Sequence, residues 1–320
     1  MRPTATDALP ECTSTLSNRI PSSGRPLLGI AIPAYKREHL LGRLLDSIHG
    51  DWPIVVSDNG GYLSEGFMDR HQKVRFHAGP EVTVLKNWNR AAAELNTEWI
   101  IMPGDDDLYY PTSFSTIERT LLSSSNADIV FFGHHIIDEH DRRCETWQPE
   151  AGLLTAPKGF DRIRLGASAR PPSIVFRKRL FDQLNGFDEQ FTVTAGDNHF
   201  YQRASLIGNV VFCPEVVSGY RVWPAGSTQQ TIATPEWMRE IDLWCDGVRE
   251  FASKHTSYRY TFALHDEIYT ANLRAGIGAL KSRGKYLGAW HHLLGNRYPY
   301  RASLLSQVKL LAHLLLPLRK

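Results

Sequence analysis

The sequence predicts an α/β fold, in which helices cover both faces of a mostly parallel sheet and a helical C-terminal region follows. Two observations carry this prediction. From residue 27 to about residue 223, short apolar runs alternate with stretches of helical periodicity, the pattern of strand–helix–strand units. Beyond Trp223 the strand pattern stops and helical patterns continue to the end of the chain.

The strands and helices follow from local patterns. Pro33 ends the first apolar run, and the next stretch repeats leucine and isoleucine at helical spacing. Asp58-Asn59-Gly60-Gly61 is a turn signal that closes the second strand. The expected strands are 27–32, 53–57, 74–77, 99–102, 128–133, 173–176, 210–212 and 216–222; the expected helices are 36–49, 62–72, 87–96, 112–124 and 197–206.

Composition limits the class of protein. The chain has 320 residues, 42% hydrophobic and 22% charged, which suits one large globular domain with an appendage. No apolar run approaches the length of a membrane span. Residues 1–26 are rich in Ser, Thr and Pro, and we expect a disordered tail there rather than a signal peptide. Four scattered cysteines argue against a zinc site or a disulfide framework and fit a reducing cytoplasm: Cys12, Cys144, Cys213 and Cys245.

Three polar segments follow strands of the predicted sheet. They are Pro33-Ala34-Tyr35, Ser57-Asp58-Asn59, and the acidic triplet Asp105, Asp106 and Asp107. Ligands of such sheets bind beyond the carboxyl ends of the strands. Adjacent carboxylates repel one another, and a divalent cation reverses this repulsion; Mg²⁺ commonly binds one or two carboxylates together with substrate phosphates. The alternative is a solvated acidic turn.

Four blocks, in order, resemble the family 2 glycosyltransferases, which have a GT-A fold. The blocks are residues 30–37, 55–60, 89–111 with the acidic triplet, and 186–189 followed by Asp197 and Arg203. The resemblance covers residues 27–223 and implies a catalytic domain at 27–225 with a helical extension at 226–320. It implies a Mn²⁺ or Mg²⁺ ion at Asp106 and Asp107, with Asp105 toward a ribose. Gly104 stands where the commoner motif begins with Asp.

The resemblance also implies a site for a nucleotide-diphosphate sugar. Asp58 would contact the nucleoside and Tyr35 would stack on the base, although a turn-forming Asp and a plain loop aromatic are the alternatives. Arg37 begins a helix, where an anion is favoured, and Arg221 would face the diphosphate. The full set of expected contacts is Pro33, Tyr35, Arg37, Asp58, Lys86, Asn89, Asp105, Asp106 and Arg221.

Asp197 is the expected catalytic base for an inverting transfer, because relatives place an Asp there, six residues before an Arg. Gly196 stands where Glu is usual, and the alternative for Asp197 is a helix N-cap. The expected acceptor-side residues are His199, Arg203 and Trp223; Trp223 occupies the place of a histidine that often lies near the metal. We interpret the histidines His134, His135 and His199 as core or acceptor-pocket residues rather than metal ligands.

Charge is divided unevenly along the chain. Residues 268–320 contain nine Lys or Arg and no Asp or Glu, whereas the other 267 residues carry 27 basic and 34 acidic residues, a formal charge of −7. Basic residues mixed with aromatics and leucines are typical of a segment that lies on an anionic membrane surface. Helices packed on the catalytic domain are the main alternative, and nucleic-acid binding is disfavoured. We therefore expect a cytoplasmic protein, peripheral at the inner face of the membrane.

The functional hypothesis is a metal-dependent, inverting glycosyltransferase of hexosyl or deoxyhexosyl type. Its acceptor would be a glycan, free or lipid-linked, in bacterial lipopolysaccharide O-antigen or capsule synthesis. A catalytically silent sugar-nucleotide- or glycan-binding subunit is the alternative. A dinucleotide-dependent oxidoreductase is disfavoured because the first strand leads into Pro33-Ala34-Tyr35 instead of Gly-x-Gly-x-x-Gly. A nucleotidyltransferase is disfavoured because the chain lacks a basic, glycine-rich loop for a triphosphate.

Overall fold

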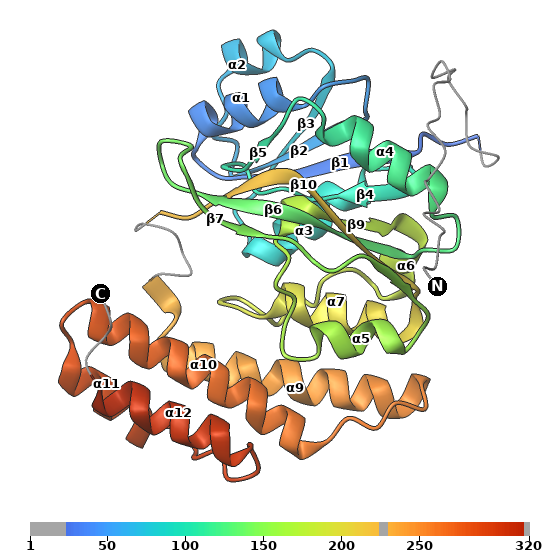
Figure 1. Cartoon of the computed structure of the whole chain (residues 1–320). Coiled ribbons are helices and arrows are strands. Elements are labelled where there is room, and N and C mark those ends of the chain that lie inside the picture. Colours follow the sequence, from blue (N-terminus) through green and yellow to red (C-terminus); the bar gives the residue numbers. More distant parts are fainter. Residues whose placement is uncertain (1–23, 224–229, 317–320) are drawn as a thin grey trace, which may run out of the picture.

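The computed structural model describes residues 24–223 and 230–316, so most of the expected N-terminal tail, with Cys12, lies outside the described residues. A ten-stranded sheet forms the upper part of the molecule, and four C-terminal helices lie below it (Figure 1). The strand order is β3-β2-β1-β4-β9-β6-β10-β5, with β7 paired to β6 and β8 to β10.

The structure confirms most of the expected elements within a few residues. The strands are β1 Leu28–Ala34, β2 Ile54–Asn59, β3 Val74–Gly79, β4 Trp99–Ile101, β5 Leu108–Tyr109, β6 Ile129–Ile137, β7 Arg143–Trp147, β8 Gly152–Leu154, β9 Ile174–Arg177 and β10 Val210–Arg221. The helices are α1 Glu38–Ser47, α2 Glu65–Arg70, α3 Val84–Ala93, α4 Ser113–Ser123, α5 Lys158–Ile163, α6 Lys178–Gln183, α7 Gly196–Ile207, α9 Pro235–His255, α10 Phe262–Ser282, α11 Tyr286–Leu294 and α12 Leu304–Leu315, with a 3₁₀ turn at Pro171–Ser173.

The sheet is mostly parallel, as predicted. Strands β3, β2, β1 and β4 pair in parallel. Strand β9 is antiparallel to both β4 and β6, so β6 runs in the same direction as β4, and β10 is parallel to β6. Six strands thus end at the same edge of the sheet, and the polar segments that follow β1, β2 and β4 meet there.

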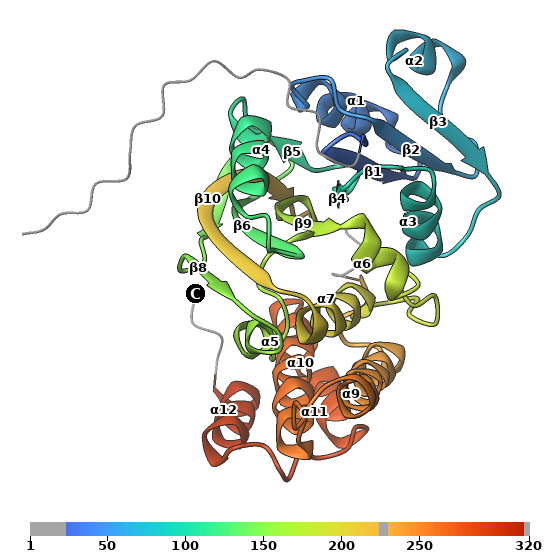
Figure 2. The same cartoon turned by 90° about the vertical axis from the view of Figure 1, so that its right-hand side faces the viewer.

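Alternate residues of each strand face opposite layers of helices. Leu28, Ile30 and Ile32 of β1 pack under α1, α2 and α4, whereas Ala31 packs with α3 and α7 on the other face. A third core joins α5 and α7 to the C-terminal helices, and Figure 2 shows α9–α12 stacked beneath them. Helix α7 is therefore packed on the sheet on one side and on the C-terminal helices on the other.

Two parts of the sheet differ from the prediction. The expected strands 210–212 and 216–222 form one strand, β10, whose register shifts around Pro214. Proline lacks an N–H donor, and a bulge lets the strand continue past it. The polar segment after residue 137 contains β7, which pairs with β6 and is largely exposed. Its charged sequence carries no apolar alternation from which a strand could be predicted.

Two global expectations can be compared with the described part of the chain. Its three cysteines, Cys144, Cys213 and Cys245, are all free. No helix in this part combines the length and apolarity needed to cross a bilayer.

Candidate active site

The acidic triplet follows β4 and is held by main-chain donors. Asp105 Oδ2 accepts the N–H of Tyr35 at 2.9 Å, which ties the triplet to the end of β1. Asp107 Oδ2 accepts the N–H of Gly104 at 2.7 Å, and its Oδ1 accepts the N–H of Arg221 at 3.2 Å, which ties it to the end of β10. Asp105 and Asp107 are buried and Asp106 is partly exposed. Three strand ends therefore converge on this loop.

Arg37 is the counter-ion of the triplet. Its guanidinium forms an ion pair with Asp105 and lies 2.5 Å from Asp106 Oδ2, measured from Nη1. The same group lies 5.8 Å from the ring centroid of Trp223. The structure thus brings together Tyr35, Arg37, the acidic triplet and Trp223.

Burial sets the ionisation of the triplet. Desolvation raises the pKa of Asp105 to about 6, although the charge of Arg37 opposes this shift. Desolvation and the neighbouring charge of Asp106 raise the pKa of Asp107 well above its usual value. A cation at this loop would favour the ionised forms.

Steric crowding explains why glycine precedes the triplet, at Gly104. A Cβ atom at Gly104 would lie 3.0 Å from Asp106 Oδ1 and 3.2 Å from Asp107 Oδ2. A side chain here would crowd both carboxylates. The departure from the commoner acidic motif is therefore compatible with an intact acidic site.

Asp58 at the end of β2 has one carboxylate oxygen available to a ligand. Its Oδ2 accepts the N–H of Leu63 at 2.9 Å, so the residue does form the turn. Its Oδ1 is buried and has no hydrogen-bond partner. A buried, unpaired carboxylate oxygen is costly, and a hydroxyl or base N–H from a ligand would satisfy it.

An aromatic and charged cluster lies beside β1. The rings of Tyr35 and Tyr62 meet edge to face at 5.7 Å, and both hydroxyls donate to Glu81. The ammonium of Lys36 lies 4.5 Å from the Tyr35 ring centroid and 4.4 Å from that of Tyr62. Tyr35 is thus a fixed ring at the strand end.

Asp197 lies in the first turn of α7. The N-cap is Ala195, whose φ is +61°, so the alternative of Asp197 as an N-cap is wrong. Asp197 Oδ1 accepts the N–H of Asn198 at 2.7 Å. Desolvation raises the pKa of Asp197, while the positive charge of Arg170 opposes this. The raised pKa is suited to a general base.

The pKa of Tyr220 responds to the charges of both Asp197 and the acidic triplet. Burial raises the pKa of Tyr220 to about 12, and the charges of Asp107, Asp197 and Asp106 add to the shift. Arg170, an exposed residue that sequence analysis missed, lies over the Tyr220 ring at 5.3 Å. Asp197, the expected base, and the acidic triplet thus both act electrostatically on the Tyr220 hydroxyl.

Glu240 is a second residue that sequence analysis missed. Its buried carboxylate accepts the N–H groups of Thr192, Val193 and Thr194 at 2.8–3.0 Å and the Thr192 hydroxyl at 2.9 Å. Helix α9 thereby holds the loop that leads to Asp197. The signal in the sequence was a lone acidic residue within the apolar stripe of α9.

Arg221 has a different role from the one expected. Its Nε donates to Asp106 O at 2.7 Å, its Nη1 to Asp138 O at 2.6 Å, and its Nη2 to Asp141 Oδ1 at 2.5 Å. The residue is 5% exposed. With its guanidinium engaged in this way, Arg221 braces the acidic loop instead of facing a diphosphate.

The remaining predicted nucleotide contacts are Asn89, Lys86 and Pro33. Both ends of the Asn89 amide bind the main chain of Phe187, at 2.8 and 2.9 Å, so Asn89 holds the 186–189 turn. Lys86 is exposed on α3. Pro33 is buried in β1, in register with Ser57. These residues shape the site's surroundings.

The histidines lie in packed positions. His199 is buried, which lowers its pKa to about 3, and its ring lies 5.0 Å from Phe191. A Cβ atom at Gly247 would lie 2.6 Å from His199 Nε2, so His199 fills the α7–α9 interface rather than the acceptor side. His134 and His135 pair across β6 and β7 with Trp147 and Thr146.

Two details of α7 complete the placement of the predicted residues. Arg203 lines a pocket of about 320 Å³ together with Asn89 and the 186–189 turn. A Cβ atom at Gly196 would lie 2.1 Å from Leu85 Cδ1. A side chain at position 196 would therefore require Leu85 to move.

A metal at this site would have few protein ligands. Within residues 24–223 and 230–316, no three His, Cys, Asp or Glu side chains gather around a common point. Asp106 is the partly exposed carboxylate, and Arg37 pairs with its Oδ2 and with Asp105 Oδ1. This donor set fits a Mg²⁺- or Mn²⁺-type ion that takes its other ligands from substrate phosphates and water.

No family model and no curated protein sequence matches this chain. Solved structures do. S. aureus TarS 1–349 in complex with UDP-GlcNAc has a TM-score of 0.55 at 15% identity, over 88% of this chain and 91% of that one. The mannosyltransferase PcManGT from Pyrobaculum calidifontis, in complex with GDP-Man and Mn²⁺, has a TM-score of 0.50 at 15% identity, over 90% and 86%. At this identity the likeness shows the fold, and the expected GT-A-type α/β fold with a helical C-terminal region is confirmed.

The Glu240 carboxylate can be tested through the loop it holds. Glu240→Gln replaces one acceptor oxygen by an amide that faces N–H donors, and we expect it to lower the free energy of unfolding by about 2 kcal/mol. Amide exchange at residues 192–194 should become faster. Glu236→Gln, an exposed residue on the same helix, is the control. Unchanged exchange at 192–194 would contradict the assigned role.

Proposed function

We propose that this chain is a metal-dependent, inverting glycosyltransferase that moves a sugar from a nucleotide-diphosphate sugar to a glycan acceptor. The observation that carries the proposal is the acidic triplet, which N–H groups from Tyr35, Gly104 and Arg221 hold where three strand ends converge. The fold supports it, because the similar structures include TarS in complex with UDP-GlcNAc and a mannosyltransferase in complex with GDP-Man and Mn²⁺. The acceptor we propose belongs to bacterial lipopolysaccharide O-antigen or capsule synthesis.

The donor would bind along the carboxyl edge of the sheet. The buried Asp58 Oδ1 would accept a hydrogen bond from the nucleoside, and the Tyr35 ring would pack against the base. The diphosphate would then lie toward Asp105 and Asp106. Arg37, which pairs with both carboxylates, would stay beside the diphosphate as a second positive group.

A divalent metal, held by Asp106 with Asp105 or Asp107 beside it, would supply positive charge to the departing diphosphate. The protein's own part is to keep these carboxylates in place. The N–H groups of Tyr35, Gly104 and Arg221 do so by binding Asp105 and Asp107. The partly exposed Asp106 is left to face the ligand.

Asp197 would take the proton of the attacking acceptor hydroxyl. Its raised pKa makes the carboxylate a stronger base than an ordinary Asp. The positive charge of Arg170 favours the ionised form of Asp197, and Glu240 fixes the loop that leads to it. The acceptor side would include Arg203 and Trp223.

The second candidate is a catalytically silent subunit that binds a sugar nucleotide or glycan. The observation in its favour is that Arg37 already pairs with two of the three carboxylates, so part of their charge is balanced without a metal ion. Hydrolysis of the donor without added acceptor would separate the two. A silent subunit would bind the donor and leave it intact.

Asp197→Asn tests the base. The amide has nearly the same shape but cannot take a proton, so we expect the rate of transfer to fall about 10²- to 10⁴-fold. The dissociation constant of the donor should stay within about twofold, as measured by calorimetry. Asp69→Asn, at an exposed residue on α2, is the matched control. Near-normal turnover of Asp197→Asn would remove Asp197 as the base.

The pH profile gives a separate test of Asp197. The reaction needs the ionised carboxylate, so kcat should fall as the pH falls through the raised pKa, with an acid limb above the range of an ordinary Asp. Arg170→Gln removes a positive charge that lowers this pKa, and the limb should therefore move to higher pH. Arg142→Gln, at an exposed turn, should leave the limb in place. An acid limb that Arg170→Gln does not move would contradict this electrostatic link.

Asp106→Asn tests the metal. Loss of the outward carboxylate should weaken Mn²⁺-dependent donor binding by about 10- to 100-fold. Thermal shift with a panel of nucleotide sugars, with and without Mn²⁺, measures this effect. The Asp69→Asn variant again serves as the control. A Mn²⁺ dependence equal to that of the unaltered protein would count against Asp106 as a ligand.

A further inference from the structure

Helices α11 and α12 carry apolar side chains on two opposite faces. On α11, Ala289 and Leu293 are buried against the other helices. The opposite side of α11 exposes Leu287, Trp290 and Leu294, at 78%, 43% and 75% of their surface. A surface helix normally places charged or polar residues there.

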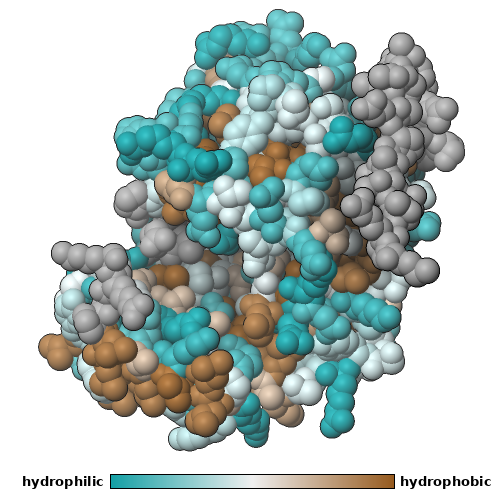
Figure 3. All heavy atoms as spheres, viewed as in Figure 1, coloured by the Kyte–Doolittle hydropathy of each residue, from teal (hydrophilic) through white to brown (hydrophobic). Residues whose placement is uncertain are grey.

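Helix α12 repeats this arrangement. Leu310 and Leu314 point into the core of the C-terminal helices. Leu304, Val308 and Leu315 are exposed on the other side. We call the exposed side chains of Leu287, Trp290, Leu294, Leu304, Val308 and Leu315 the outer apolar face. Figure 3 shows a hydrophobic surface over the place where Figure 1 shows α11 and α12.

The outer apolar face is not needed to attach α12 to the protein. At the start of the helix, Glu267 accepts the N–H of Ser303 and the hydroxyl of Ser306, each at 2.5 Å. At its end, the buried ammonium of Lys281 donates to the carbonyl oxygens of His313 and Leu316 at 2.5 Å and of Leu314 at 3.2 Å. Both ends are thus fixed by polar contacts, and none of these contacts involves the exposed leucines.

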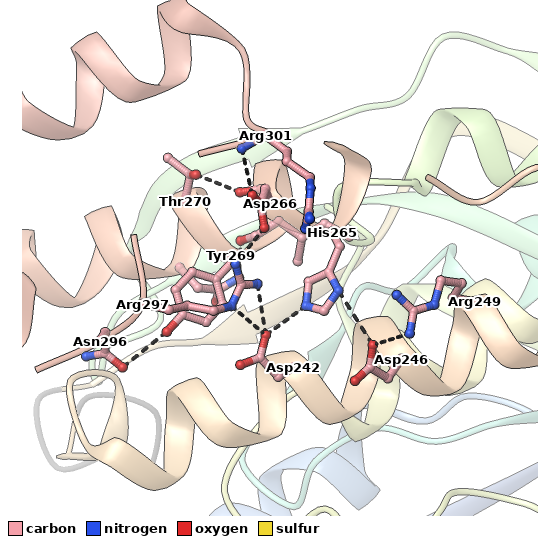
Figure 4. Close-up of polar contacts among 12 residues, drawn as sticks. Asp242, Asp246, Arg249, His265, Asp266, Tyr269, Thr270, Asn296, Arg297 and Arg301 are labelled. Carbon is pink, nitrogen blue, oxygen red and sulfur yellow. Dashed lines mark hydrogen bonds and ion pairs between the residues drawn. The ribbon is translucent and has the colours of Figure 1, made fainter. Parts of the chain in front are cut away.

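The connection between α11 and α12 is equally well fixed. Arg297 pairs with Asp242 at 3.0 Å and with Asp266 at 2.6 Å, and Asp266 also accepts the N–H of Arg301 at 2.8 Å (Figure 4). His265 bonds Asp242 at 2.7 Å within the same network. The connection between the two helices is therefore held in place, and we call α11 and α12 together the platform.

The charge around the platform is positive. The network in Figure 4 pairs Asp242 and Asp266 with basic groups, and the sequence contains no Asp or Glu between residues 268 and 320. Lys285 and Lys309 are exposed beside the leucines. Glu267, bound to Ser303 and Ser306, is an acidic residue at this border, and the exposed lysines make the border mainly basic. An apolar face with a mainly basic border is complementary to a surface with apolar material under negative charge.

We infer that the outer apolar face docks on the surface of an anionic lipid bilayer. Leucines would enter the boundary between head groups and acyl chains, Trp290 would lie at the interface, and the lysines would contact lipid phosphates. A second copy of this chain fits less well, because a two-fold contact would bring two mainly basic borders together. The inference deepens the proposed function, since it would hold the enzyme beside lipid-linked acceptors.

Vesicle co-sedimentation tests the inference with the whole chain and without donor or acceptor, so its failure is distinct from that of the proposed transferase. We expect binding to vesicles of equal parts phosphatidylglycerol and phosphatidylcholine, and weaker binding at high salt. The triple variant Leu287→Gln, Leu294→Gln, Leu304→Gln should bind at least about tenfold more weakly. Lys285→Gln and Lys309→Gln should each weaken binding by about fivefold.

The control is a triple variant at exposed leucines elsewhere: Leu122→Gln, Leu153→Gln, Leu165→Gln. The control variant should bind vesicles as the unaltered protein does. All variants should have the melting temperature of the unaltered protein. Failure of the unaltered protein to bind anionic vesicles would overturn the inference, as would equal losses in both triple variants. A solution dimer that the first triple variant dissociates, without vesicle binding, would assign the face to a second copy and also overturn it.

Discussion

The site depends on keeping three adjacent carboxylates together at the end of one strand. Burial of Asp105 and Asp107 penalises their charge, and the nearby Asp106 adds repulsion. The structure offsets these costs with N–H groups from Tyr35, Gly104 and Arg221 and with the guanidinium of Arg37. These groups come from the segment after β1, from β10 and from the loop itself. The three elements are held together because all of them bind the same carboxylates.

The same reasoning explains how the C-terminal helices bear on the site. Asp197 lies on α7, which packs against the sheet on one side and against α9 on the other. Glu240 of α9 accepts the donors of the loop before Asp197, and His199 fills the interface between the two helices. The helical region is thus part of the scaffold that positions the proposed base, besides presenting the outer apolar face.

Sequence patterns predicted the fold well where one physical signal dominated. Apolar runs with turn signals located β1, β2 and β4, and helical spacing located α1, because burial selects these side chains directly. The prediction failed where pairing overrode local pattern. Strand β10 continues past Pro214 because it pairs with β6 on both sides of a bulge. The charged strand β7 forms because it pairs with β6.

By itself, the sequence determined the parallel α/β order, the polar segments at strand ends, the acidic triplet, Asp58, Asp197 and the basic C-terminal region. Tertiary structure alone decided which of these residues face each other. Arg221 turned inward to brace the acidic loop, Asn89 turned to the 186–189 turn, and Glu240 and Arg170 joined the site from distant segments. The physical reason is that composition and spacing specify which side chains are buried or charged. The partners of a buried charge, in contrast, lie on strands and helices that only the packing of the chain brings next to it.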